Sequence, residues 1–331
     1  ARAFAGNFDT TELLEAIDYC HIHNVKLYMA VNTLLKNSEM KDLIPYLDPF
    51  YREGVDGIIV QDVGVIRSLS QAYPDLPLHG STQMSVCSTY GAEFLKNLGM
   101  TRFVPARELS LNEIKSIKEA VDIEIETFVH GAMCFCYSGK CLMSSFAGGR
   151  SGNRGRCAQP CRKAYNSKQF NHEYALSMKD MCTLASLPQL IEAGIDSFKI
   201  EGRMKKPEYV AAAVHAYSEI TDECINGHLN EKRIAYHTDR LMDIYNRGGF
   251  SSGYYYMKNG KEMLANKRPN HTGTLIGKVE AVEAPFVYIR LERGIQAKDV
   301  LEIRTGTEQN IELTSNVTAQ AGQKIRLNAN N

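Results

Sequence analysis

Five of the nine cysteines lie within residues 134–161, in the stretch CFCYSGKCLMSSFAGGRSGNRGRCAQPC. Four of them, Cys134, Cys141, Cys157 and Cys161, are spaced as C-x6-C-x15-C-x3-C. Thiolates in such numbers are typical ligands of zinc or of an iron–sulfur cluster. The C-x2-C pairs of structural zinc sites are absent, and a cluster accepts looser spacing because its ligands reach different corners. The spacing therefore favours a cluster and leaves zinc open.

The other cysteines point to a reduced chain without structural disulfides. Nine is an odd number, which argues against a fully paired disulfide framework and favours a reducing, cytoplasmic setting. Cys136 lies two residues from Cys134 and would point to the opposite side of an extended segment, as a spare or packing residue. The other four lie in apolar surroundings and are predicted to be small buried side chains: Cys20, Cys87, Cys182 and Cys224.

The charge around the cysteines is strongly positive, although the chain as a whole has 38 basic and 38 acidic side chains. No Asp or Glu occurs from Thr127 to His172. Seven bases lie there, namely Lys140, Arg150, Arg154, Arg156, Arg162, Lys163 and Lys168. These cations would offset the negative charge of a thiolate-bound metal group, or would attract an anionic substrate.

The elements that must position these residues alternate between strands and helices. Short β-branched runs are predicted as strands at 25–32, 56–62, 76–82, 101–108, 123–131, 174–180 and 196–203. Amphipathic helical segments separate most of them, which predicts parallel pairing through right-handed crossovers. We expect an α/β fold of the (β/α)8, TIM-like barrel type. A dinucleotide-binding sheet is less well supported, because no G-x-G-x-x-G turn opens a helix.

Polar residues follow these strands, and the carboxyl ends of barrel strands form the active face. The alternative is that some of them cap helices or form salt bridges at the mouth of the barrel. The residues are Asn32, Gln61, Asp62, Thr82, Gln83, Arg107, Glu108, His130, Lys179, Asp180, Glu201 and Arg203.

Residues 132–172 interrupt the alternation directly after a strand, so they are predicted to be a long insertion on the active face. The expected organisation is a barrel over 1–226, a helical connection over 227–270 and a small β-barrel domain over 271–331. The last of these shows short alternating strands such as FVYIRLE and KIRLN. No apolar run is long enough to span a membrane.

ETFVHGAMCFCYSGKCLMSS and GGRSGNRGRCAQPCR resemble the signature of the U32 peptidase-like, or collagenase-like protease, family. LHGSTQMS, SFKIEGRMKKPEYV and RPNHTGTLIGKV support this resemblance. Among its branches, the chain is most similar to the tRNA hydroxylation protein P type. Members usually begin with a strand–helix–strand unit ahead of ARAFAGNF. We therefore expect residues to be missing before Ala1, which leaves the barrel incomplete at its N-terminus.

The resemblance implies a [4Fe–4S] cluster on the four cysteines that match the family motif, Cys134, Cys141, Cys157 and Cys161. It also implies formation of 5-hydroxyuridine at the wobble position (U34) of tRNA, with prephenate as co-substrate in place of dioxygen. The anticodon stem-loop is then the expected partner, and a paralogous U32 subunit is a further one.

Residue roles follow from this reading. A dicarboxylate requires cations, for which Arg107, Lys179, Lys199 and Arg203 are candidates. Four groups are candidates for proton transfer: Asp62, Glu108, His130 and Glu201. Arg150, Arg154 and Arg156 would approach RNA phosphates, and Asn32 and Gln83 would contact the substrate. Tyr137, Phe146 and Tyr165 would stack on an unpaired base.

Three alternatives remain open. The first is a U32-type peptidase, although neither a G-x-S-x-G elbow nor an H-E-x-x-H zinc motif is present. The second is hydroxylation of an rRNA cytidine or of a ubiquinone precursor, as in sister branches of the family. The third is a non-catalytic RNA-binding module with a structural metal.

Overall fold

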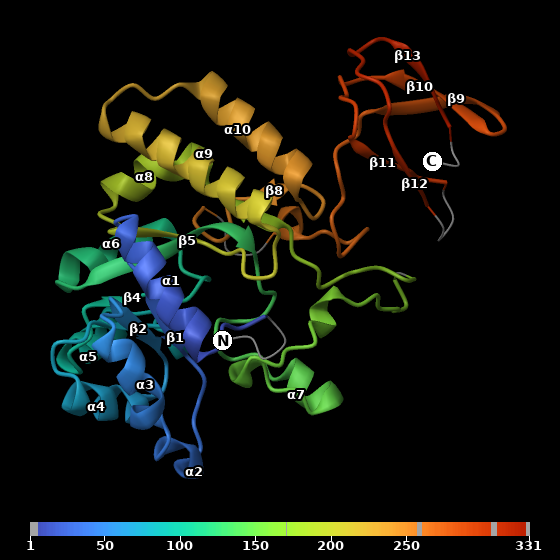
Figure 1. Cartoon of the computed structure of the whole chain (residues 1–331). Helices are drawn as coiled ribbons and strands as arrows, with labels where there is room; N and C mark the ends of the chain where they lie inside the picture. The colour runs from blue at the N-terminus through green and yellow to red at the C-terminus, as the bar shows by residue number, and fades with distance from the viewer. Residues whose placement is uncertain (1–5, 170, 257–259, 306–309, 329–331) are drawn as a thin grey trace. The chain divides into compact units, whose positions relative to one another are not determined.

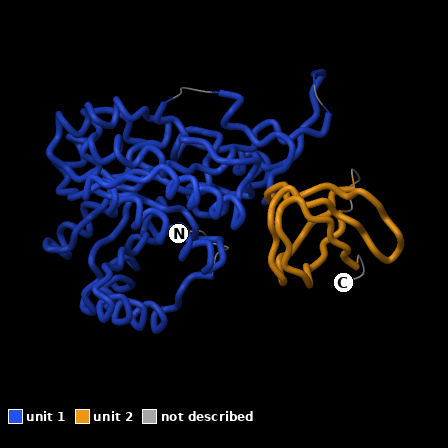
Figure 2. Tube along the Cα trace, turned by 90° about the horizontal axis from the view of Figure 1, so that it is seen from above, with its two compact units in different colours: residues 1–272 blue, residues 273–331 orange. Residues whose placement is uncertain are grey.

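A computed structural model of the chain describes residues 6–169, 171–256, 260–305 and 310–328. The chain forms two compact units, residues 1–272 and 273–331, and each unit has its own hydrophobic core (Figure 2). The expected barrel and helical connection both fall within the first unit. No helix in the described ranges is both long and apolar enough to cross a bilayer.

The first unit is built on one sheet of eight short strands, most of them paired in parallel. Buried apolar side chains such as Ile58, Val60, Phe103 and Ile125 place its strands in the core. The strands are β1 (Tyr28–Val31), β2 (Gly57–Val60), β3 (Leu78–Gly80), β4 (Arg102–Phe103), β5 (Glu124–Ala132), β6 (Asp180–Cys182), β7 (Ser197–Ile200) and β8 (Phe250–Ser251).

The order of the strands confirms a mostly parallel α/β sheet and corrects one predicted strand. β1 to β5 pair in parallel in chain order, and β7 pairs in parallel with β5. β6 pairs antiparallel with β5, and β8 pairs in parallel with β6. The parallel strand predicted at 174–180 is wrong in position and in direction. β6 begins only at Asp180, and it runs antiparallel to β5 because the insertion returns the chain without a long crossover helix. In the described residues no pairing joins β7 to β1, so closure into a barrel stays a prediction.

Helices between the strands cover the sheet with their apolar faces, and α9 and α10 pack side by side (Figure 1). In α6, Ser110 caps the first turn, and Leu111, Ile114 and Ile117 are buried at helical spacing. The helices are α1 (Thr10–Ile22), α2 (Asn37–Met40), α3 (Leu43–Arg52), α4 (Val63–Ala72), α5 (Thr89–Asn97), α6 (Leu111–Ala120), α7 (Met143–Gly148), α8 (Leu187–Glu192), α9 (Pro207–Ile225) and α10 (Glu231–Ile244). Short 3-10 turns are η1 (Thr82–Met84), η2 (Gly152–Arg154), η3 (Pro160–Arg162), η4 (Leu184–Ser186) and η5 (Lys261–Met263).

The second unit is a small antiparallel β region. β10 (Phe286–Leu291) pairs with β9 (Gly277–Glu283) and with β13 (Lys324–Asn328), and β11 (Val300–Ile303) pairs with β12 (Ile311–Thr314). Alternate residues Val287, Ile289 and Leu291 of β10 are buried in a core that both sheets share. The predicted alternation is therefore present, while closure of these strands into a barrel stays a prediction.

Candidate functional site

The cysteine-rich insertion leaves the sheet at the end of β5 and returns to it at β6. Gly131, in β5, has a φ of +107°, and a Cβ atom there would lie 2.3 Å from the carbonyl oxygen of Glu201. Only glycine allows this approach of β5 to the segment that follows β7. The insertion therefore starts at a tight junction between two strand ends, where the sequence predicted an active face.

Arg162 ties the two ends of the insertion together. Its guanidinium donates hydrogen bonds to the Met133 carbonyl at 3.0 Å, to Ser177 Oγ at 2.7 Å and to the Met178 carbonyl. Because the guanidinium spans both chain segments, the neighbouring Cys161 is held at the base of the insertion.

A second anchor fixes the first turn of the insertion. The Ser138 backbone nitrogen donates to Glu108 Oε1 at 2.5 Å, and its hydroxyl donates to Glu108 Oε2 at 2.9 Å. The Ser138 carbonyl accepts from Ser85 Oγ at 2.5 Å. A Cβ atom on Gly139 would lie only 2.2 Å from the Gln83 carbonyl oxygen. Glu108 is therefore an anchor of the loop, and its predicted role in proton transfer stays a prediction.

The predicted phosphate-binding arginines are partly committed to contacts within the protein. Arg154 forms a bidentate ion pair with Glu39 of α2, at 2.6 and 2.8 Å, and donates to the Leu34 carbonyl at 2.6 Å. The hydrogen bond from Arg154, followed by that from the Lys36 backbone, lowers the pKa of Glu39 to about 2. Arg150 donates to the carbonyl of Arg156, whose own side chain is exposed.

The thiols of the insertion lie within electrostatic range of one another. Burial raises the pKa of Cys161, the neighbouring Arg162 lowers it, and the charges of Cys134, Cys157 and Cys141 raise it further. All nine cysteines are free. In the described part of the chain no three His, Cys, Asp or Glu side chains lie close enough to hold a single metal ion. Four thiols in an acid-free loop are a donor set of the type that iron–sulfur clusters use, and binding of such a cluster here stays a prediction.

The cysteines outside the four-cysteine motif have different surroundings. The thiol of Cys136 is hydrogen-bonded to Cys141, and burial followed by the charge of Cys141 raises its pKa. Cys87 was predicted to be buried and is exposed, because it lies beyond the end of β3 in the turn that leads into α5. Cys182 and Cys224 pack against the core, in the manner expected of small apolar side chains.

A cluster of cations that the sequence did not predict lies beside the base of the insertion. Arg247 donates to Asp180 Oδ1 at 2.7 Å, and the Lys205 ammonium lies 2.6 Å from the ring centroid of Tyr245. Burial, and then the charge of Arg247, lowers the pKa of Lys205 to about 7. The same two causes lower the pKa of Arg162. Three cations thus act on one carboxylate, and the group carries a net positive charge. We call Arg162, Lys205 and Arg247 around Asp180 the cation cluster.

Polar atoms in this cation cluster lack partners. Asp180 Oδ2 and Arg247 Nε are buried and have no hydrogen-bond partner in the described ranges. Burial is the main cause that raises the pKa of Asp180, against the opposing charge of Arg247. Arg247 Nε is an open donor that an anionic ligand could satisfy, whereas Asp180 Oδ2 is an acceptor that needs a donor group on the ligand.

His130 lies in the core behind the insertion. Its side chain is only 1% exposed, and neither ring nitrogen has a hydrogen-bond partner among the described residues. The rings of Tyr209, Tyr217 and Phe250 each lie 5.6 Å from its own. Burial, and then the charge of Lys205, lowers the pKa of His130 to about 4, so the imidazole is neutral near pH 7. Its predicted proton-transfer role would therefore need a neutral imidazole.

The other predicted strand-end residues are spread over several structural contacts. Asp62 caps α4 through the backbone nitrogen of Gly64 at 2.8 Å, and Lys199 pairs with Glu126. Asn32 donates to Ser81 Oγ at 3.2 Å. Lys179 and Glu201 are half-buried and Arg203 is exposed. The roles assigned to these side chains stay predictions.

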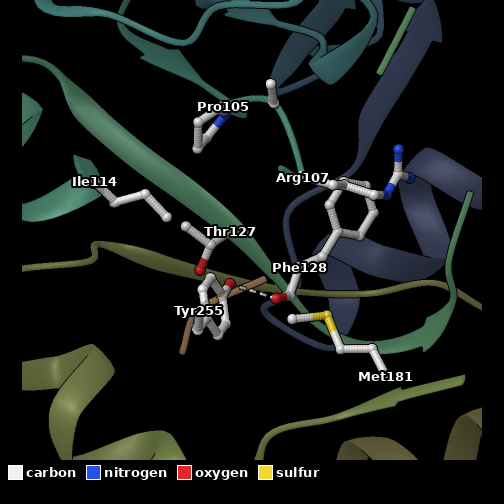
Figure 3. Close-up of a pocket in the computed structure, with 8 residues that line it drawn as sticks. Pro105, Arg107, Ile114, Thr127, Phe128, Met181 and Tyr255 are labelled. Carbon is white, nitrogen blue, oxygen red and sulfur yellow. Dashed lines mark hydrogen bonds between the residues drawn. The ribbon is translucent and has the colours of Figure 1, made fainter. Parts of the chain in front are cut away.

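Arg107 and the predicted aromatic residues have contrasting surroundings. The Arg107 guanidinium lies 3.8 Å from the centroid of the Phe128 ring, beside a cavity of about 10 Å³ that is too small for a substrate (Figure 3). Tyr137 and Phe146 are 70% and 86% exposed on the insertion, which is what stacking on an unpaired base requires. The Tyr165 hydroxyl donates to the Pro160 carbonyl at 2.9 Å.

These features define a class of α/β protein in which a basic, cysteine-rich insertion lies over the carboxyl ends of a mostly parallel sheet. The chain belongs to peptidase family U32, whose family model matches residues 1–265. The resemblance read from the sequence motifs is thereby confirmed.

Three relatives with different names show how varied the family is. An uncharacterized protease of Methanocaldococcus jannaschii is 37% identical over 77% of this chain and 65% of its own. The tRNA hydroxylation protein P1 of Bacillus subtilis is 40% identical over 67% of this chain and 55% of its own. The 23S rRNA 5-hydroxycytidine C2501 synthase of Escherichia coli is 33% identical over 88% of this chain and 46% of its own. The chain thus spans about half to two thirds of the length of these relatives.

Proposed function

We propose that this chain is the core of an RNA hydroxylase, and that its product is 5-hydroxyuridine at the wobble position, U34, of tRNA. The observation that carries the proposal is the position of the cation cluster beside the four-thiol insertion. Relatives named as tRNA hydroxylation proteins and as an rRNA hydroxycytidine synthase support hydroxylation of RNA. The exposed aromatic residues and bases of the insertion would approach the anticodon stem-loop.

Cys134, Cys141, Cys157 and Cys161 would hold a [4Fe–4S] cluster, which would supply the redox chemistry that the side chains themselves lack. Side chains of this protein hold the insertion that would carry the cluster. Arg162 fixes the base of the insertion, while Ser138 and Glu108 fix its first turn. The absence of acidic side chains from the loop keeps its field positive, which favours deprotonated thiolates.

The cation cluster is the proposed site of the dicarboxylate co-substrate, prephenate. Arg247 Nε offers an open donor, and Lys205 has a charge that no carboxylate contacts directly in the described residues. Carboxylates bind such cations strongly where water is scarce. We prefer this assignment to the predicted set of Arg107, Lys179, Lys199 and Arg203, because Lys199 is already paired with Glu126. The roles of the other three stay predictions.

Nucleoside mass spectrometry tests the function directly. We expect 5-hydroxyuridine in tRNA from a deletion strain that carries the full-length gene, and none in tRNA from the same strain with an empty vector. Hydroxycytidine in 23S rRNA is measured in the same samples. Hydroxycytidine in rRNA together with unmodified tRNA would mean that rRNA is the substrate. The absence of both modified nucleosides would contradict the proposal.

The affinity for prephenate is expected to fall as pH rises through about 7. Lys205, whose pKa lies at about 7, loses its charge in this window, while Arg247 and Arg162 stay charged and Asp180 and Glu201 oppose them. KM for prephenate at saturating tRNA should therefore rise by up to about tenfold between pH 6 and pH 8. A Lys205→Met variant should show the higher KM already at pH 6 and little further rise. An equal rise in the variant and in the parent would contradict the assignment.

A peptidase is the second candidate, favoured by the relative named as a protease. A thiol or hydroxyl nucleophile requires a neighbouring base. His130 lies directly before the insertion, and neither of its ring nitrogens has a hydrogen-bond partner among the described residues, so it activates neither a cysteine nor a serine; His172, near the far end of the insertion, is exposed. Digestion of casein or gelatin that survives replacement of the four cysteines would favour this candidate over the hydroxylase.

A further inference from the structure

A second cavity lies at the carboxyl ends of β2 and β3, on the side of the sheet where the insertion returns to η1. It has a volume of about 410 Å³, which is within the range of small-molecule sites. The residues that line it and the residues of the cation cluster have no member in common. Its walls come from the end of β2, from η1, from α5 and from residues 139, 140 and 153 of the insertion.

Two glutamine side chains on its wall have polar atoms without partners. Gln61 is only 7% exposed, and its Nε2 has no hydrogen-bond partner in the described part of the chain. Gln83 Oε1 is likewise buried and without a partner. A buried polar atom without a partner costs about 1–3 kcal/mol, and both atoms are closed off from solvent, so a ligand in the cavity would reach them once the two amides turn toward it.

The remaining walls suit a flat, partly apolar ring. Val63, Met84 and Phe94 line the cavity, and Val63 and Phe94 expose 42% and 52% of their surface. Lys140 lies at the same cavity, where its ammonium can meet a phosphate. The two amides offer one donor and one acceptor, and the edge of a pyrimidine base presents the complementary pair.

The cavity is joined rigidly to the cysteine-rich insertion. Gly139 contacts the Gln83 carbonyl so closely that no Cβ atom fits, and Ser85 donates to the Ser138 carbonyl at 2.5 Å. Lys140 directly precedes Cys141 in the chain. A ring in this cavity would therefore lie beside the proposed cluster ligands.

We propose that this cavity receives a pyrimidine base flipped out of the RNA, and that Gln61 and Gln83 hydrogen-bond to its edge. The proposal rests on the proposed function and deepens it, because it says which residues recognise the reacting base. Base flipping exposes the edge of a pyrimidine to such groups, and the exposed Tyr137 and Phe146 can stack on its neighbours.

Binding, measured without turnover, tests the proposal. The probe is a synthetic anticodon stem-loop RNA with unmodified uridine at the wobble position, compared with the same RNA carrying an abasic site there. We expect the parent protein to bind the uridine RNA about tenfold more tightly, and Gln61→Leu or Gln83→Leu to bind both RNAs with the weaker affinity. The matched control is Gln71→Leu on the exposed side of α4, which should keep the full preference. Thermal unfolding confirms that each variant is folded.

The outcomes separate this proposal from the hydroxylase itself. A preference for uridine that is lost in the Gln61 and Gln83 variants supports the cavity even where no hydroxylated nucleoside is formed. Equal binding of both RNAs by the parent protein overturns it. So does an unchanged preference in the variants, and in that case an intact hydroxylation activity would leave the proposed function standing.

Discussion

Replacing Cys157 with serine is expected to remove the iron–sulfur cluster and, with it, all formation of 5-hydroxyuridine. A serine hydroxyl is a far weaker ligand for iron than a thiolate, and the fifth thiol of the insertion, Cys136, lies beside Cys141 and outside the four-cysteine motif. Iron and acid-labile sulfide in anaerobically purified protein should fall at least about tenfold. Cys157 is exposed, so the substitution itself should not disturb the core.

Cys136→Ser is the matched control for this experiment. Cys136 belongs to the same insertion and is hydrogen-bonded to Cys141, but it lies outside the four-cysteine motif. We expect it to keep its iron and its visible absorbance, as should Cys20→Ser in α1. Iron retained by Cys157→Ser, or a colourless protein that contains stoichiometric zinc, would contradict the cluster and with it the redox function.

Replacing Arg247 with glutamine is expected to lower the free energy of unfolding by about 3–5 kcal/mol. Asp180 is only 2% exposed, and the 2.7 Å bond from Arg247 is its main compensation in the core. Without the guanidinium, the buried carboxylate keeps only the hydrogen bond from the Arg247 backbone and the more distant charges of Lys205 and Arg162. Urea unfolding followed by circular dichroism measures the loss as a lower midpoint with an unchanged slope.

The double variant Asp180→Asn, Arg247→Gln is the control. It removes both charges together, so it should recover most of the lost stability.

The pH dependence of the Arg247→Gln effect has a defined sign. Burial raises the pKa of Asp180 above its unfolded value, so the folded state binds more protons and stability falls as pH rises through the folded pKa. The loss of unfolding free energy caused by Arg247→Gln should therefore become smaller as pH is lowered. A deficit that is independent of pH, or one that the double variant keeps in full, would show that lost packing on Tyr245 is the cause.

The sequence predicts the elements of the first unit well, because each strand and helix has a strong local pattern. β1 to β4 and β7 lie within their predicted ranges, and β5 extends one residue beyond its range, to Ala132. The direction of β6 could not be predicted in this way. Apolar patterning states which residues are buried, but it does not state which neighbour a strand pairs with after a long insertion.

The candidate site was predictable only in part for the same reason. The four cysteines are identified by type and spacing within a single segment. The cation cluster joins Arg162, Lys205 and Arg247 from three distant segments, and no local pattern brings them together. GRMKKP after β7 and YNRGG before β8 are basic and rich in glycine, and this was the only available signal. Asp62 closely follows β2, as predicted, whereas Glu108 lies in the loop between β4 and α6. The sequence did not reveal that both carboxylates would bind backbone nitrogens.

The guanidinium of Arg162 bears on how the insertion would respond to loss of the proposed iron–sulfur cluster. The insertion is closed at its base by β5, β6 and three hydrogen bonds from one side chain, none of which uses a thiol. Loss of the proposed cluster would therefore leave the base of the insertion closed, with the four cysteines still carried on one folded segment. Such an apoprotein would be able to take up a cluster again without refolding.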